Sequence, residues 1–89
     1  MMCDIKFRFD SHKNTLYDMW KLTEIICEHA VYANSDGCWY VEDEPEPNVA
    51  VNIYNVTEEQ CFLIRDDIRT AEWDGPQPVM EQKEMMTNE

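Results

Sequence analysis

An unbroken alternation of apolar and charged side chains runs through the stretch Cys3-Asp4-Ile5-Lys6-Phe7-Arg8-Phe9-Asp10. Successive side chains of a β-strand point to opposite faces, so a period of two places the apolar residues on one face and the charged residues on the other. The apolar face needs a core, whereas the charged face can lie in water. We therefore expect a half-buried strand over residues 3–10.

Apolar residues at helical spacing predict two helices. The first begins at a cap supplied by Ser11, Asn14 or Thr15, runs to about Ala33 and buries one face. That face consists of Leu16, Met19, Leu22, Thr23, Ile26, Cys27 and Ala30. The second begins at Thr57-Glu58-Glu59-Gln60, which fits a capping box, and ends at Asp74-Gly75-Pro76-Gln77-Pro78. Its apolar stripe consists of Cys61, Ile64, Ile68 and Ala71.

Two further strands, over residues 38–42 and 49–54, are joined by a turn with two prolines and form a hairpin. The order β-α-β-β-α predicts an α+β fold, with a three-stranded, mainly antiparallel sheet and both helices on one face. Residues 49–54 lie in the middle and run antiparallel to residues 3–10; the alternative pairs residues 3–10 in parallel with 38–42. Residues 1–75 make a single domain, and 76–89 form a C-terminal tail or a short docked helix.

The net charge is −12, from 19 acidic residues against 7 Lys and Arg. Such a chain repels phosphate backbones and anionic membranes, so direct nucleic-acid binding and membrane binding are not expected. No apolar run approaches the roughly 20 residues that span a bilayer, and the first residues lack the apolar core of a signal peptide. We expect a cytoplasmic protein.

Chemistry-bearing residues are few and dispersed. The cysteines, at positions 3, 27, 38 and 61, form no C-x-x-C pair, and we interpret them as reduced core residues rather than metal ligands. His12 and His29 have no nucleophile or carboxylate at a spacing typical of a catalytic triad. We therefore expect no enzymatic activity, no metal and no cofactor.

Negative charge is concentrated in the middle of the chain, because residues 22–64 contain nine Asp and Glu and no Lys or Arg. One interpretation is a solvated face with acids that complement a helix dipole. The other is a contiguous negative field that binds a protein surface made for nucleic acid, since acids about 6–7 Å apart approach the charge spacing of a DNA strand. The predicted contact residues are Asp36, Glu42, Asp43, Glu44, Glu46, Glu58 and Glu59.

In size, acidity and lack of catalytic motifs the chain resembles the small phage-encoded inhibitors of host defence, the anti-CRISPR proteins and DNA mimics. The resemblance is to a class, so it assigns no role to any single residue. It implies a non-catalytic protein that occupies the basic groove of a nucleic-acid-binding complex, in the host cytoplasm.

Two alternatives use other residues. An interaction module or antitoxin-like subunit, or a homodimer, would use exposed apolar side chains at Trp39, Tyr40, Phe62 and Leu63. An open sheet face with two tyrosines beside Lys6 and Arg8 could instead stack bases, although the net charge opposes this.

Overall fold

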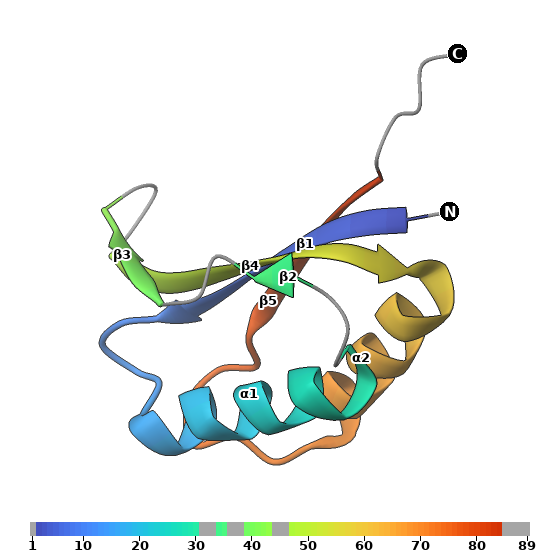
Figure 1. Ribbon diagram of the computed structural model, residues 1–89. Helices are drawn as coiled ribbons and strands as arrows, with labels where there is room; N and C mark the ends of the chain where they lie inside the picture. The colour runs from blue at the N-terminus through green and yellow to red at the C-terminus, as the bar shows by residue number, and fades with distance from the viewer. Residues whose placement is uncertain (1, 31–33, 36–38, 44–46, 85–89) are drawn as a thin grey trace.

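The computed structural model describes residues 2–30, 34–35, 39–43 and 47–84, and its elements alternate between strands and helices (Figure 1). In chain order they are β1 (Met2–Asp10), α1 (Leu16–His29), β2 (Asn34–Ser35), β3 (Tyr40–Glu42), β4 (Asn48–Thr57), α2 (Glu58–Thr70) and β5 (Val79–Glu84). Both helices lie on the same side of the sheet. The predicted α+β class is confirmed.

The sheet is antiparallel throughout its described pairings and has the order β2-β4-β1-β5, with β3 also beside β4. The expected central position of residues 49–54 and their antiparallel pairing with residues 3–10 are therefore confirmed. Phe7 lies opposite Val51 and Ile5 opposite Ile53, so both strands direct apolar side chains to the helical side. The register shifts between Cys3 and Ile5, and Asn55 has a φ of 62°, a conformation that Asn tolerates in bulges.

Residues 79–84 form a strand, so the docked helix predicted for this part of the chain is wrong, and so is the expected number of three strands, because β2 and β5 also belong to the sheet. Residues Val79–Glu84 pair antiparallel with β1, from Arg8 opposite Val79 to Cys3 opposite Glu84. Two turns of isolated helix are marginal in water, whereas the free edge of β1 offers a hydrogen-bonding partner to each alternate backbone group. Pairing with β1 therefore stabilises residues Glu81-Gln82-Lys83-Glu84 as a strand more than their own preference stabilises a helix, and the sheet gains a strand.

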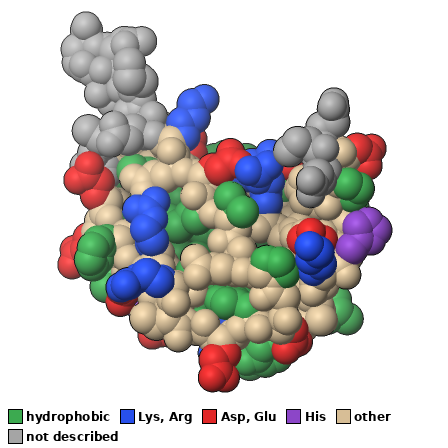
Figure 2. Space-filling model, turned by 180° about the vertical axis from the view of Figure 1, so that it is seen from behind, with side chains coloured by type: hydrophobic (Ala, Val, Ile, Leu, Met, Phe, Trp, Pro, Cys, Tyr) green, Lys and Arg blue, Asp and Glu red, His purple; other side chains and the backbone are tan. Residues whose placement is uncertain are grey.

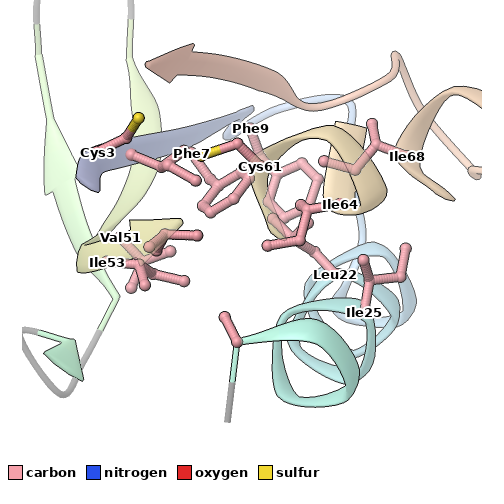
Figure 3. Packing of buried hydrophobic residues seen from close by; sticks show 13 residues of the cluster. Cys3, Phe7, Phe9, Leu22, Ile25, Val51, Ile53, Cys61, Ile64 and Ile68 are labelled. Carbon is pink, nitrogen blue, oxygen red and sulfur yellow. The ribbon is translucent and has the colours of Figure 1, made fainter. Parts of the chain in front are cut away.

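The core lies between the sheet and the helices. Figure 3 shows Phe7 of β1, Leu22 of α1 and Ile64 of α2 packed together in this layer, and all three are completely buried. The predicted stripe of α2 is confirmed at Cys61, Ile64 and Ile68, and the capping box between Thr57 and Gln60 is present. The helix ends at Thr70, earlier than the predicted stop at residues 74–78.

Helix α1 presents part of the predicted face to the core: Leu22 and Ala30 are buried, and Met19 and Ile26 pack against the buried cluster. It starts after the N-cap Thr15 and ends at His29 instead of near residue 33, and its buried residues are Asp18, Leu22 and Ile25. Leu16 is 81% exposed, and Thr23 and Cys27 are exposed as well, so their predicted burial is wrong. The turn of the helix toward Asp18 explains the difference, because that side chain is anchored in the interior.

Asp18 connects the start of α1 to the segment after α2. Its carboxylate is fully buried and accepts hydrogen bonds from Asn14 Nδ2 (2.8 Å) and from the backbone N–H groups of Thr15 (3.3 Å), Asp74 (2.8 Å) and Gly75 (3.0 Å). Burial by itself would raise the pKa of Asp18, but these four hydrogen bonds favour the charged form and the pKa is lowered. Helical periodicity alone predicts that a charged residue such as Asp18 is exposed to solvent.

The cysteine prediction holds in part. Cys3 and Cys61 are buried as expected, whereas Cys27 is exposed, and Cys38 lies outside the described residues. Burial and the neighbouring Cys3 thiol raise the pKa of Cys61 to about 12. The Cys61 thiol is therefore not a nucleophile at neutral pH.

None of the described helices combines the length and the apolar character needed to cross a membrane.

Candidate functional site

The described members of the predicted acidic contact set lie at the two ends of β4. Glu42 and Asp43 precede the strand, whereas Glu58 and Glu59 follow it at the start of α2. Ten extended residues measure about 33 Å, so the two pairs are far apart on the molecule (Figure 1). Asp36, Glu44 and Glu46 lie outside the described residues.

Glu42 is compensated by a cation of the sheet. Lys6 Nζ lies 2.5 Å from Glu42 Oε2, and the side chains are only 29% and 24% exposed. This hydrogen bond raises the pKa of Lys6 above its ordinary value, although burial opposes it. Glu42 is therefore part of the sheet's own charge balance, while the neighbouring Asp43 is exposed.

The open face of the sheet carries both positively and negatively charged side chains. Arg8 of β1 pairs with Glu81 of β5, and Asn52 Nδ2 donates to the Tyr40 hydroxyl at 2.7 Å. The cations and one of the tyrosines of the base-stacking alternative are thus engaged with neighbours in the sheet. In Figure 2, which shows the molecule from behind, Lys and Arg side chains lie among acidic ones, so the chain is not negative on every side.

The helix α2 presents the clearest exposed surface. Because Cys61, Ile64 and Ile68 are buried, the residues between them point outward: Phe62 is 67% exposed and Leu63 is 41% exposed. We call the exposed residues Glu58, Glu59, Phe62 and Leu63, together with half-buried Asp66, the outer face of α2. Residues three or four apart on a helix are neighbours about 5–6 Å apart, so carboxylates lie on both sides of the two apolar side chains.

Only part of this surface is neutralised within the described residues. Arg69 pairs with Asp66, and Arg65 reaches Gln82 of β5 at 2.8 Å. In the described part of the chain no ion pair involves Glu58 or Glu59, and both lie in the first turn, where the helix dipole favours negative charge. The outer face thus combines two free carboxylates with an exposed aromatic ring.

Four residues of the outer face of α2 were predicted from the sequence but divided between two hypotheses, and Asp66 was in neither. Glu58 and Glu59 belonged to the acidic contact set, and Phe62 and Leu63 to the apolar alternative. Trp39, also of that alternative, instead stacks on Phe9 with ring centroids 5.5 Å apart and packs against the core. The spacing of the α2 stripe was sufficient to unite the other four, because positions off the stripe share one side of the helix.

A second exposed apolar group was missed. Leu16, Tyr17 and Trp20 of α1 are 81%, 45% and 58% exposed, and the two aromatic rings lie 6.1 Å apart. The helical spacing predicted Leu16 in the core, and no predicted surface included Tyr17 or Trp20.

One described group has the donor atoms for a metal ion: Glu28, His29 and Asp67, where α1 and α2 approach each other. The structure also has a hollow of about 270 Å³ at the end of the sheet, beside Arg8 and Asp10, and one of about 460 Å³ between α2 and β5, beside Arg65 and Arg69. The hollow between α2 and β5 is bordered by cations and so does not extend the acidic surface.

Comparison of the chain with protein-family models, curated proteins and solved structures gave no match in any of the three.

Proposed function

We propose that the protein is a non-catalytic acidic inhibitor that occupies the basic surface of a nucleic-acid-binding protein, and that it docks through the outer face of α2. The observation that carries this proposal is the exposure of Glu58 and Glu59, free of ion pairs among the described residues, next to a Phe62 ring that is 67% exposed. Phe62 and Leu63 are exposed side by side, and adjoining exposed apolar side chains rimmed by polar residues are typical of interaction sites.

The two components of this surface have different physical roles. A net charge of −12 steers the protein toward a cationic surface and raises the association rate, an effect that salt screens. An apolar anchor excluded from water slows dissociation, because buried aromatic side chains dominate the binding energy of most interfaces. The combination fits a partner with a basic surface around an apolar pocket.

The dimensions of the molecule are also compatible with a groove that normally holds duplex. The acids at the two ends of β4 are about 33 Å apart along the strand, close to the roughly 34 Å of one turn of DNA. A cationic surface that follows one helical turn could contact Asp43 at one end and Glu58 at the other.

The experiment compares two double variants of equal charge. Glu58→Gln with Glu59→Gln removes two charges from the outer face, and Glu24→Gln with Glu72→Gln removes two exposed charges elsewhere. Nucleic-acid-binding proteins captured with the wild-type chain from a nuclease-treated lysate are purified and tested for displacement of their nucleic acid. We expect the first variant to lose displacement by at least about tenfold, since each 1.4 kcal/mol corresponds to a factor of ten, and the second to retain it.

Equal displacement by both double variants would place the binding surface elsewhere. Failure of the wild-type chain to displace nucleic acid from any captured protein would contradict the inhibitor proposal itself.

The exposure of Phe62 and Leu63 also favours a second function, an interaction module or homodimer with an apolar interface. Salt separates the two, because an electrostatically driven complex weakens steeply as salt increases and an apolar one does not. Phe62→Ala should weaken both types, whereas Leu16→Ala, which alters the exposed group of α1, should weaken neither. Sedimentation of the chain alone at low and high salt tests the homodimer directly.

A further inference from the structure

The place where the two helices approach each other brings together three metal-binding side chains. Glu28 and His29 lie in the last turn of α1 and Asp67 lies in α2, and one donor atom of each is within 4.8 Å of the others. His29 Nε2 is 2.5 Å from Asp67 Oδ2. Residues 38 positions apart in the chain are thus positioned by helix packing, not by local sequence.

The surroundings suit an ion that keeps water ligands. The His29 side chain is 17% exposed and that of Asp67 is 38% exposed, so the packing of the helices holds both in place while leaving access from solvent. A hollow of about 210 Å³ lies beside them, lined in part by Glu28, Asp67 and Thr70. A water molecule occupies about 30 Å³ of the liquid, so the hollow has room for several.

The donor set selects the class of ion. Calcium and magnesium take oxygen ligands, whereas an imidazole nitrogen with two carboxylates suits zinc and its neighbours in the first transition row. We propose that Glu28, His29 and Asp67 bind a divalent transition-metal ion such as Zn²⁺, which links the C-terminal end of α1 to α2.

Only a small rearrangement is needed. Tetrahedral ligands about 2.0–2.1 Å from zinc are roughly 3.3 Å from each other, so His29 Nε2 and Asp67 Oδ2 must separate by about 0.8 Å from their present contact. The Glu28 donor, within 4.8 Å of the other two, must approach them by at most about 1.5 Å. A partly exposed contact between two polar side chains adds little to stability, and its replacement by a metal therefore costs little. Nearby Glu24 and the excess of acid in the whole chain favour the added positive charge, while Lys21 at the edge of the same hollow opposes it.

Binding is tested by thermal unfolding of the full chain with Zn²⁺, Mg²⁺ or Ca²⁺, and by the visible absorption of bound Co²⁺. To exclude capture of the metal by thiols, all proteins carry Cys27→Ser, at an exposed position, and Cys38→Ser. We expect Zn²⁺ to raise the melting temperature by several degrees, Mg²⁺ and Ca²⁺ to leave it nearly unchanged, and Co²⁺ to produce a d–d band that Zn²⁺ abolishes.

The variants identify the site. His29→Gln keeps a hydrogen-bond donor for Asp67, and it should weaken Zn²⁺ binding by at least about tenfold. Glu28→Gln, at an exposed position that does not threaten folding, should weaken it as well. His12→Gln alters the other histidine, which is exposed in the turn before α1, and should bind as the parent does.

The proposal is overturned if the parent shows neither a Zn²⁺-dependent shift nor a Co²⁺ band, or if His29→Gln and Glu28→Gln bind as tightly as His12→Gln. Equal shifts with Zn²⁺, Mg²⁺ and Ca²⁺ would also overturn it, because they would indicate screening of the acidic surface by any divalent ion.

Discussion

Replacement of Asp18 by Asn should destabilise the protein by roughly 2–4 kcal/mol. The buried carboxylate accepts four N–H groups, one on Oδ1 from Asp74 and three on Oδ2. Asparagine has only one acceptor oxygen, so in its better orientation the N–H of Asp74 loses its partner, which costs about 1–3 kcal/mol. The remaining bonds become neutral, and each is weaker than a bond to a charged group.

This loss is a large fraction of the total, because a chain of this length is stabilised by roughly 4–13 kcal/mol. At about 4–8 °C per kcal/mol, the melting temperature should fall by roughly 8–32 °C. Urea unfolding followed by circular dichroism measures the change as a shift of the midpoint at constant slope. Asp66→Asn is the matched control, since its exposed pair with Arg69 should contribute at most about 1 kcal/mol.

The effect has a defined pH dependence. The pKa of Asp18 is lowered from its ordinary value of 3.8, so its contribution is present above that value and is lost as the pH falls through the lower pKa of the folded state. Wild type and Asp18→Asn should therefore differ most near neutral pH and converge below about pH 4. A difference below about 1 kcal/mol at pH 7, or one independent of pH, would refute the assignment of Asp18 as the anchor of this region.

Three further results are expected. Gly75→Ala should destabilise by about 1–3 kcal/mol in the same urea assay, because a Cβ at that position would lie 2.3 Å from the backbone oxygen of Lys13; a stability equal to that of wild type would show that this turn moves easily. Iodoacetamide labelling at pH 8, mapped by mass spectrometry, should modify the exposed Cys27 rapidly and leave the buried Cys3 and Cys61 unmodified until the protein unfolds. Burial also raises the pKa of Cys61 to about 12, so early modification of Cys61 would contradict its burial. Added salt should raise the melting temperature by screening the repulsion within a chain of net charge −12, and a constant value would mean that the acids are too dispersed to repel one another.

The parts of the fold that were predictable are those specified by local pattern. The alternation in β1 and the Thr57 capping box each depend on residues within a few positions, and both appear as expected. The strand β5 was not predictable in this way, because its partner lies more than seventy positions earlier and its own residues favour a helix. The burial of Asp18 on α1 was missed for a related reason: its hydrogen-bond donors include the backbone of residues 74–75, which lie far away in the sequence and cannot be recognised from a local pattern.

The candidate site shows the same division. The exposure of Phe62 and Leu63 followed from the stripe of α2, which local spacing reveals. Lys6, which neutralises Glu42, lies 36 positions away in the chain, so Glu42 was predicted to be a free charge. The cluster of His29 with Asp67 depends likewise on how two helices pack, so neither histidine had an evident partner in the sequence.

The position of β1 between β4 and β5 has a consequence for the order in which the protein is made. β1 is synthesised before both of its neighbours, which arrive only with residues 48–57 and 79–84, so Cys3 pairs with Glu84 only after the whole stretch between them has been made. Until then β1 has an unpaired edge with alternating apolar side chains, a feature that promotes association between nascent chains. Translation speed and chaperone supply should therefore affect the yield of this protein more than its small size suggests.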